Sequence, residues 1–565
     1  MKKTIITTLM VVLVAVPSWA VYSPPADRVV TWTGNVGIPG GIPDRPTEID
    51  CTQAPYNVPT DGTSDCKTAI TACLAGISSN QVAYLPAGTY NIQSDIVVPS
   101  NKVLRGAGMG NTNIVGKTPY TYTWGLIGFN QTNSFSTAVN ISGSPAKGAT
   151  TIDTAAAHNL STGDYIIIDQ LDTGAEADPP VTNVGDNGTC GWCGRTSGRS
   201  QGQVNRVASI PTSTQFTVEV PLYFGFATAQ TPQVSKMNGV TVNAGVENLT
   251  LDNSVTQRDN ALIMNYAAFS WFKNVELNYS KRIAILLIGY KNTIYGSVLH
   301  TTSLPLTSNS GYGIWAQIGA SANLIENNVI YDLSNPIIIN GAVSGNVFAY
   351  NYLHGHDGNT GRQNGAFSSH GGHPAMNLLE GNYMVGEVAL DFTWGSSSHF
   401  TMFRNKMKLQ NPLSTYAQYK FLAWYGQKNW YHSMIGNILW TTGDTGSYEC
   451  SGTINTEVSQ CVYLLGYQLY TQVDAATAST LLRHANYDYL NAAIQYNGAD
   501  DHTLPNSLYL TEKPDWYVGT WPPADPSAPS MAVIPSEYYY INGSWPTAIP
   551  SSFTGGSMSG GVSIR

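Results

Sequence analysis

Short apolar segments that end in a polar residue, usually asparagine, recur through the middle of the chain and constrain its fold more than any other feature. They read NVELN, NTIYGS, NLIENN, NVFAYN, NLLEGN, FTMFRN and MIGN, and end at Asn278, Ser297, Asn328, Asn351, Asn382, Asn405 and Asn437. Successive ends lie roughly 20 to 30 residues apart, which is typical of a solenoid whose coils tolerate loop insertions. We therefore predict that each segment belongs to one turn of a parallel β-helix.

The repeats also predict which side chains face inward. Three positions before each polar end, every residue is apolar, which places these side chains in the core: Val275, Ile294, Ile325, Phe348, Leu379, Met402 and Met434. One position later the alternation of a strand turns the side chain outward: Glu276, Tyr295, Glu326, Ala349, Glu380 and Phe403. We expect the terminal asparagines to stack in a hydrogen-bonded ladder, and Glu380 to lie on the surface, either binding a ligand or simply solvated.

The N-terminus and the overall charge limit where the protein works. Lys2 and Lys3 precede an apolar run up to Val16 and a small-residue ending at Ala20, which predicts a secretory signal peptide, with an uncleaved anchor as the alternative. Later in the chain no apolar run reaches the ~18 residues of a membrane span. A net charge of −9 argues against a general nucleic-acid partner. We expect a secreted or periplasmic protein.

Cysteine spacing predicts disulfides, which persist in an oxidising compartment. Cys66 and Cys73 lie about 10 Å apart on an expected helix, too far for a bond, so Cys51 is expected to pair with one of them. The segment GTCGWCGR is expected to hold a local disulfide rather than a redox or metal motif, because no βαβ pattern surrounds it. Two pairs follow from short spacing, Cys190 with Cys193 and Cys450 with Cys461. The seventh cysteine has no predicted partner.

Two segments resemble a known family. PTDGTSDCKTAITACLAGISSNQVAYLPAGTYNIQSDIVVPSNKVLRGAGMGNTNI, from Pro59 to Ile114, resembles the opening coil of the pectate-lyase-like right-handed parallel β-helix superfamily. LPNSLYLTEKPDWYVGTWPP, from Leu504 to Pro523, resembles the closing segment of a poorly characterised secreted bacterial branch. The resemblance implies an all-β right-handed parallel β-helix solenoid with an N-terminal capping helix. It leaves function open, because polysaccharide lyases, glycoside hydrolases, epimerases and phage tailspikes share this scaffold.

Composition shifts divide the chain. From about residue 138 to 237, alternating strands separated by turn residues predict a small β subdomain inserted into the solenoid. The expected order is a signal peptide (1–20), an extended leader (21–50), the cap with the first coils (51–137), the inserted subdomain (138–237), the main coils (238–465), and a C-terminal covering segment with a tail (466–565). We expect the inserted subdomain to form one wall of a groove.

Histidines gather in one part of the solenoid. Five of the ten lie close together in sequence: His354, His356, His370, His373 and His399. Aligning Asn382 with Asn405 places the last three of these on one face within two coils, with Asp391 on a following turn. The loop HGHDGNTGRQNG is expected to overhang this face with substrate-binding side chains, and Trp394 offers a platform for a sugar ring. The overhanging residues are His354, His356, Asp357 and Arg362.

This set suits two reactions on a polysaccharide. β-Elimination from a uronate needs a base, for which the candidates are His370, His373 and His399, and a cation for the carboxylate, for which they are Arg404 and Arg362. Hydrolysis needs two carboxylates, either Glu380 with Asp391 or Asp357 with Asp391. No motif fixes a cofactor. Two alternatives are kept: a metal ion held by a carboxylate and a histidine pair, either His354 with His356 or His370 with His373, and a divalent cation such as calcium as a cofactor.

We therefore expect a secreted carbohydrate-active enzyme that cleaves a polysaccharide, with a lyase acting on a uronate-containing glycan ahead of a glycoside hydrolase. The alternative is a non-catalytic polysaccharide-binding or extracellular matrix protein, in which the histidines form a structural hydrogen-bonded network.

Overall fold

The computed structural model describes residues 21–119, 125–129, 134–172, 184–302, 310–355, 365–409, 420–440, 446–454, 460–468, 471–497 and 502–549. Within these residues the α-helices are α1 (Lys67–Gly76), α2 (Ala475–Thr480) and α3 (Pro535–Asn542), and the other regular structure is almost entirely strand. The predicted all-β class is confirmed. None of the described helices has the length and hydropathy of a membrane span.

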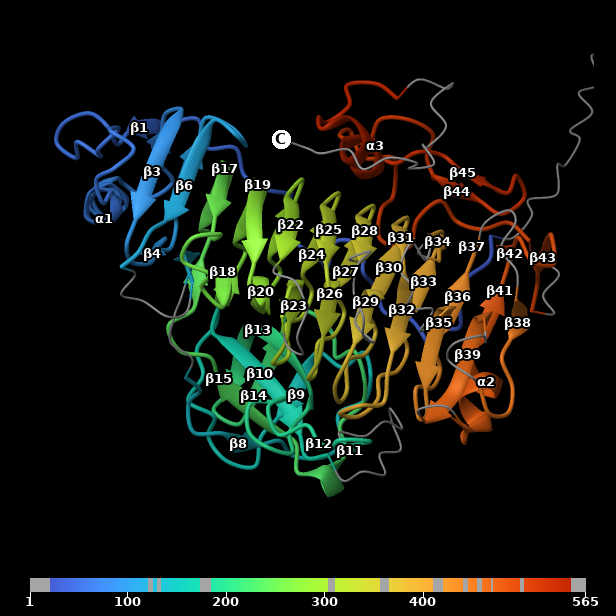
Figure 1. The fold of residues 1–565 in the computed structure, drawn as a ribbon. Helices are drawn as coiled ribbons and strands as arrows, with labels where there is room; N and C mark the ends of the chain where they lie inside the picture. The colour runs from blue at the N-terminus through green and yellow to red at the C-terminus, as the bar shows by residue number, and fades with distance from the viewer. Residues whose placement is uncertain are drawn as a thin grey trace, which may run out of the picture.

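The body of the molecule is a parallel β-helix in which three strands form each coil (Figure 1). One coil, for example, consists of β30 (Leu378–Glu380), β31 (Tyr383–Val385) and β32 (Glu387–Leu390). Each strand pairs in parallel with its counterpart in the next coil: β33 (Thr401–Phe403), β34 (Lys406–Lys408) and β35 (Lys420–Gly426). Three parallel ladders therefore run along the solenoid.

The three ladders extend over most of the chain. The first contains β21 (Thr293–Tyr295), β24 (Leu324–Glu326), β27 (Val347–Ala349), β30, β33, β36 (Ser433–Ile435) and β41 (Leu482–His484). The second contains β22 (Val298–Thr302), β25 (Val329–Leu333), β28 (Tyr352–Gly355), β31, β34, β37 (Ile438–Leu439) and β42 (Asn486–Asp488). The third contains β18 (Asn260–Ala268), β20 (Ile283–Tyr290), β23 (Tyr312–Ala316), β26 (Asn335–Ile339), β29 (Gly365–Ser369), β32, β35 and β39 (Gln460–Gln468).

The first coils lie beside the capping helix. They contain β1 (Glu48–Asp50), β2 (Val82–Leu85), β3 (Gly88–Ile92), β4 (Ile96–Val97), β5 (Val103–Gly106), β6 (Thr112–Gly116), β7 (Ile127–Gly128), β17 (Gly245–Asp252) and β19 (Trp271–Ser280). Helix α1 covers the open end of the core with Ile70, Cys73 and Leu74, all fully buried. The predicted capping helix is confirmed (Figure 1).

The asparagine ladder is confirmed, and a second one lies beside it. The Nδ2 atom of Asn382 donates to Oδ1 of Asn405 at 2.9 Å, and Asn351 donates in the same way to Asn382 at 3.0 Å. These ladder asparagines are fully buried, so their amides satisfy one another and the backbone of the turn. The second ladder, which the sequence analysis did not identify, lies five residues earlier in each coil: Asn292, Asn323, Asn346 and Asn377.

The first repeat is aligned differently from the prediction. Asn278 pairs with His300 rather than with Ser297, so NVELN is displaced by three residues from its predicted place. The reason is that β19 runs on as one long strand where later coils turn at an asparagine. The inward register of the later repeats is confirmed, since Ile325, Phe348 and Leu379 pair in sequence along the ladder and are fully buried.

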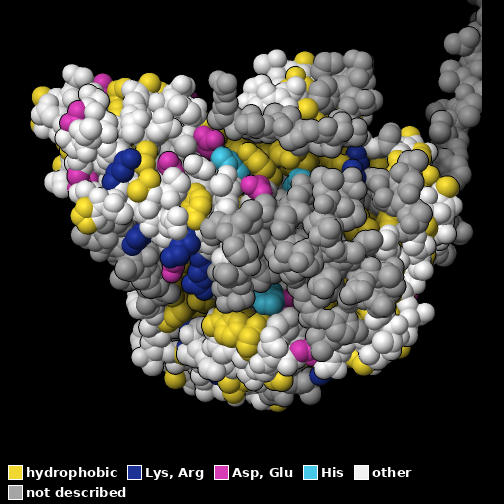
Figure 2. Space-filling model, in the orientation of Figure 1, with side chains coloured by type: hydrophobic (Ala, Val, Ile, Leu, Met, Phe, Trp, Pro, Cys, Tyr) yellow, Lys and Arg dark blue, Asp and Glu magenta, His cyan; other side chains and the backbone are white. Residues whose placement is uncertain are grey.

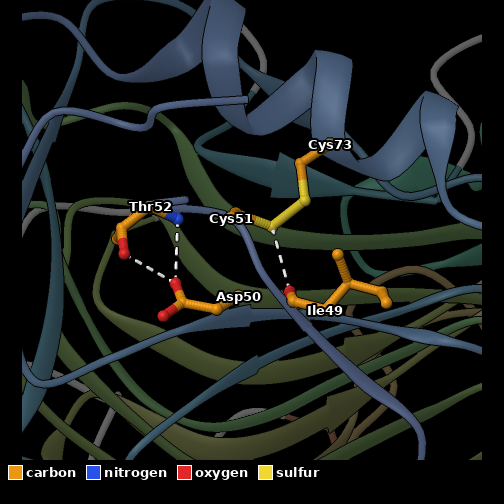
Figure 3. The surroundings of a disulfide bond; sticks show 5 residues. All are labelled: Ile49, Asp50, Cys51, Thr52 and Cys73. Atoms are coloured by element: carbon orange, nitrogen blue, oxygen red, sulfur yellow. Dashed lines mark hydrogen bonds between the residues drawn. A yellow bond between two sulfur atoms is a disulfide. The ribbon is translucent and has the colours of Figure 1, made fainter. Parts of the chain in front are cut away.

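Three disulfides form among the described residues. Cys51 bonds to Cys73, which ties the end of β1 to α1 (Figure 3). The other two are the predicted pairs Cys190–Cys193 and Cys450–Cys461. Cys66 is the odd cysteine; it is buried and free, and burial raises the pKa of its thiol to about 11.

The inserted subdomain is an antiparallel sheet that packs on the solenoid below the third ladder (Figure 1). Its strands, in spatial order, are β8 (Val139–Asn140), β15 (Gln233–Lys236), β10 (Tyr165–Gln170), β13 (Gln201–Thr212), β14 (Gln215–Val218) and β9 (Thr151–Asp153). A separate hairpin consists of β11 (Val184–Gly185) and β12 (Gly188–Thr189). Ile167 and Val204 of this subdomain share one apolar cluster with Tyr290 and Ile338 of the solenoid.

The C-terminal segment covers outer faces of the first and second ladders. It contains strands β44 (Ala524–Asp525) and β45 (Ser530–Met531) and helix α3, which contacts β25 and β28 of the second ladder (Figure 1). Tyr509 and Tyr517 of this segment pack with Tyr350 of the solenoid in a buried cluster. This segment buries Glu380 and Arg404, two of the predicted site residues.

Candidate functional site

A cleft of about 510 Å³ lies where the outer face of the third ladder meets the inserted subdomain. Hydrophobic side chains gather near this junction, with basic side chains beside them (Figure 2). The lining residues are Trp192, Asn260, Arg282, Ile283, Leu286, Tyr312, Trp315, Gln317, Ile338, Asn340, His370 and Trp394. Of these residues Trp192 belongs to the inserted subdomain, so the subdomain contributes to the cleft; that it forms one wall stays a prediction.

His370 and Asp391 form a pair beside this cleft. His370 directly follows β29, Asp391 directly follows β32, and the two strands are neighbours, so the side chains meet across adjacent coils. Nδ1 of His370 lies 2.6 Å from Oδ2 of Asp391, while Oδ1 of Asp391 accepts the backbone N–H of Thr393 at 2.9 Å. A carboxylate can only accept, so Nδ1 carries the proton. In the neutral ring the other nitrogen, Nε2, carries a lone pair, and no hydrogen bond joins it to another described residue.

The environment of this pair raises the pKa of His370 above its ordinary value of 6.5. Burial opposes the charged imidazolium, but the negative charge of Asp391 and the hydrogen bond to it outweigh burial. The side chain of His370 is still 31% exposed, so a ligand in the cleft can reach it. Such a histidine is a general base at pH values above its pKa.

Aromatic and amide side chains line the same cleft as His370. Arg282 lies over the ring of Trp315, 5.3 Å from its centroid, and Tyr312 contacts the same ring edge-on. The amide of Asn340 is fully buried, and neither its oxygen nor its nitrogen has a hydrogen-bond partner among the described residues. Nε1 of Trp315 is also without one there. These polar atoms are therefore buried beside the cleft that the two residues line.

The other two candidate histidines face different surroundings. His373 is buried under the inserted subdomain, where Nε2 lies 2.7 Å from Oδ2 of Asp172. His399 is buried, stacks on Tyr431 and contacts the hydroxyl of Ser398. Burial, together with the charges of nearby basic residues, lowers the pKa of His399 to about 3, so it is neutral at neutral pH. The three histidine rings therefore do not meet in one site, contrary to the prediction that they share one face.

The prediction that Glu380 lies exposed on the surface is wrong. Its side chain points away from the solenoid core as predicted, but the C-terminal segment buries it to 1% exposure. Oε2 accepts the backbone N–H of Leu508 at 2.9 Å, and burial raises the pKa of Glu380 to about 7. Strand alternation predicts which side of a strand a residue occupies, but not what later covers that side.

Arg404 is covered in the same way, away from the cleft. It donates hydrogen bonds to three backbone carbonyls of the C-terminal segment, those of Leu504, Pro505 and Ala524. This arrangement holds the covering segment on the solenoid, so Arg404 and Glu380 form no site with His370.

The remaining candidates are divided between the cleft and other places. Trp394 lines the cleft as predicted. His354 lies on β28 beside Tyr540 of α3, on the side covered by the C-terminal segment. His356, Asp357 and Arg362 lie outside the described residues. In the part of the chain that is described, no three His, Cys, Asp or Glu side chains come together as a metal site.

Five further residues of the cleft were not predicted, although the sequence carries a signal for some of them: Trp192, Arg282, Tyr312, Trp315 and Asn340. Successive strands of the third ladder carry four side chains at equivalent positions: Leu286, Trp315, Ile338 and Ser368. Aligning these strands would have placed Trp315 on the outer face. The third strand of each coil does not end in a ladder asparagine, and loops of variable length precede this strand. The asparagine repeat therefore did not identify the third strand.

Comparison with known proteins supports the fold. No protein-family model matches the chain, and neither does any curated protein sequence. The tailspike protein gp49 from Pseudomonas phage LKA1 is similar with a TM-score of 0.50 and 16% identity, over 70% of this chain and 62% of its own. The Gp54 tailspike of Acinetobacter baumannii bacteriophage AP22, in complex with capsular saccharide, gives 0.45 and 11%, over 77% and 65%.

The A-module of the Azotobacter vinelandii mannuronan C-5 epimerase AlgE4 gives a TM-score of 0.36 and 14% identity, over 74% of this chain and 98% of its own. The chain spans less than two thirds of the length of the two tailspikes. At these identities the likeness concerns the fold alone. Together with the three parallel ladders, the likeness to gp49 shows that the chain has the right-handed parallel β-helix fold that its sequence implied.

Proposed function

We propose that the protein is a secreted carbohydrate-active enzyme that binds a uronate-containing polysaccharide in the cleft and cleaves it by β-elimination. The observation that carries this proposal is the His370–Asp391 pair, whose geometry leaves Nε2 of a partly exposed histidine free to take a proton. In the reaction, the C5 proton of the uronate passes to Nε2 and a C4=C5 double bond forms. The C4–O4 bond breaks, and the leaving oxygen takes up a proton.

Arg282 supports an acidic rather than a neutral substrate. Elimination requires the uronate carboxylate to be neutralised, so that the proton on the adjacent carbon becomes acidic. Arg282 lines the same cleft as His370, and its guanidinium suits a carboxylate because the two groups form paired hydrogen bonds.

Hydrolysis is less well supported by the described residues. A glycoside hydrolase needs two carboxylates across the scissile bond, and the described lining of the cleft contains no Asp or Glu. Asp391 is engaged with His370 and Thr393, and Glu380 is buried on another side of the solenoid. We also propose that a calcium ion helps to neutralise the uronate carboxylate. The comparison of cleavage with and without chelator tests this part of the proposal.

The disulfides support secretion. Three pairs form among the described residues, and such bonds persist in oxidising compartments. The predicted signal peptide at residues 1–20 lies outside the described residues and remains a prediction.

The test is cleavage by the purified mature protein. Polygalacturonate, alginate and hyaluronate serve as acidic polymers and dextran as the neutral one, each with and without chelator. We expect the ultraviolet absorbance of unsaturated uronates to rise with at least one acidic polymer and to disappear in His370→Ala. His502→Ala, which changes an exposed histidine far from the cleft in sequence, is the matched control. Reducing ends without absorbance would contradict elimination, and no product from any polymer would contradict catalysis on these substrates.

A further inference from the structure

Trp192 is an exposed aromatic residue at the mouth of the cleft. Its side chain is 41% exposed, and it is the only tryptophan of the exposed class among the described residues. It meets Trp394 edge-on, with ring centroids 4.7 Å apart. The two rings come from different parts of the fold, Trp192 from the inserted subdomain and Trp394 from the turn after β32. An exposed tryptophan beside a second one needs an explanation that core packing does not give.

The Cys190–Cys193 disulfide docks the loop that carries Trp192 onto the solenoid. A Cβ atom added to Gly371, the residue after His370, would lie 2.7 Å from Sγ of Cys193 and 3.2 Å from Sγ of Cys190. Gly341, the residue after Asn340, likewise has no room for a side chain because the backbone of Cys193 lies against it. The Cys190–Cys193 loop therefore packs directly against Gly341 and Gly371, which follow the cleft residues Asn340 and His370 in sequence.

A second contact fixes the partner ring. The hairpin of β11 and β12 lies against the turn after Asp391, where the backbone N–H groups of Asp186 and Asn187 donate to the carbonyls of Phe392 and Thr393, both at 2.9 Å. Gly185 has no space for a Cβ atom at this contact. The subdomain thus holds both tryptophans at one end of the cleft by rigid backbone contacts.

We propose that Trp192 and Trp394 form a stacking platform for a sugar ring next to the cleaved bond, and that the Cys190–Cys193 disulfide positions Trp192 for this role. The inference rests on the proposed function, because it assigns a substrate contact to the same cleft. Trp192 is a binding residue, and the two cysteines are positioning residues. Aromatic faces suit sugar rings because the ring's C–H groups form an apolar surface.

The test separates binding from cleavage. Affinity electrophoresis measures binding to polygalacturonate, alginate or hyaluronate held in the gel. It is applied to the wild type, to Trp192→Ala and Trp192→Phe, and to the double variant Cys190→Ser with Cys193→Ser. The double variant Cys450→Ser with Cys461→Ser removes a disulfide whose residues do not line the cleft and is the matched control. We expect roughly tenfold weaker binding for Trp192→Ala and the first double variant, and near wild-type binding for Trp192→Phe and the control.

Cleavage provides the second readout. Trp192→Ala is expected to raise KM with little change in kcat, whereas His370→Ala lowers kcat. Wild-type binding by Trp192→Ala would overturn the platform, and wild-type binding by the Cys190/Cys193 variant would overturn the positioning role. Binding without cleavage by the wild type would refute the proposed reaction but keep the platform, while no binding to any polymer would refute both. Trp192→Ala changes an exposed side chain, so the test does not depend on how well the cysteine variant folds.

Discussion

His370 and Asp391 are joined across two neighbouring coils, with Nδ1 and Oδ2 2.6 Å apart, although 21 residues separate them in sequence. The carboxylate raises the pKa of the histidine above 6.5, and the base is active only when neutral. Cleavage should therefore rise as the pH increases through this raised pKa and be lost below it.

Asp391→Asn tests this coupling. Without the negative charge, burial dominates and the pKa of His370 falls, so the acidic limb of the kcat/KM profile should move to lower pH. At neutral pH kcat should fall by about 10²-fold or more, since the ring is no longer held in its productive tautomer. The pH dependence of cleavage measures both effects, with Glu512→Gln, an exposed change, as the control. An unchanged acidic limb would contradict the role of Asp391.

Arg282→Gln should distinguish charged from neutral substrates. If the guanidinium holds a uronate carboxylate, its removal should raise KM for the acidic polymer about 10- to 100-fold, because charge-assisted hydrogen bonds contribute about 1.5–3 kcal/mol. A methyl-esterified form of the same polymer should be bound almost equally by the wild type and the variant. Steady-state kinetics on both polymers provides the comparison, and an equal loss on the two would show that Arg282 does not recognise charge.

The repeat predicted the solenoid because each coil has the same internal requirement. An apolar side chain must fill the core at one position, and a buried amide must satisfy the turn three residues later, so Leu379 and Asn382 recur as Met402 and Asn405. These are local demands that the sequence records in every coil. The displaced first repeat shows the limit, because NVELN matches the pattern in letters while β19 continues through it as a strand.

The site was only partly predictable for a different reason. His370, Asp391 and Trp394 lie close together in sequence, so clustering identified them. Trp192 reaches the cleft through the docking of a subdomain about 200 residues away in sequence, which leaves no local pattern. Glu380 and Arg404 were misassigned because the segment that covers them lies at the far end of the chain.

Buried glutamates beneath the C-terminal segment should make stability depend on pH. Burial raises the pKa of both Glu380 and Glu326 to about 7 from an ordinary value of 4.5. The folded protein holds these protons more tightly than the unfolded chain does. The two groups therefore make their full contribution to the free energy of unfolding below pH 4.5, and this contribution is lost as the pH rises to 7. For one such group the loss is about 3 kcal/mol.

Glu380→Gln should reduce this dependence. The amide is neutral at every pH, so the thermal midpoint should fall less between pH 4.5 and 7 than in the wild type. Differential scanning calorimetry at several pH values measures the two slopes, and Glu512→Gln, which is exposed, should behave like the wild type. Parallel slopes for Glu380→Gln and the wild type would show that Glu380 is not protonated in the folded state.

Asn382→Ala should destabilise the solenoid strongly, because one amide serves three coils. Its Nδ2 donates to the carbonyl of Phe348 and to Oδ1 of Asn405, and its Oδ1 accepts both the backbone and side-chain N–H of Asn351. Alanine leaves these buried groups unpaired, and each such group costs about 1–3 kcal/mol, so a loss of at least about 3 kcal/mol is expected. Chemical denaturation followed by circular dichroism measures it. Asn542→Ala, at an exposed helix end, is the matched control, and an equal loss in the two variants would mean that the ladder contributes little to stability.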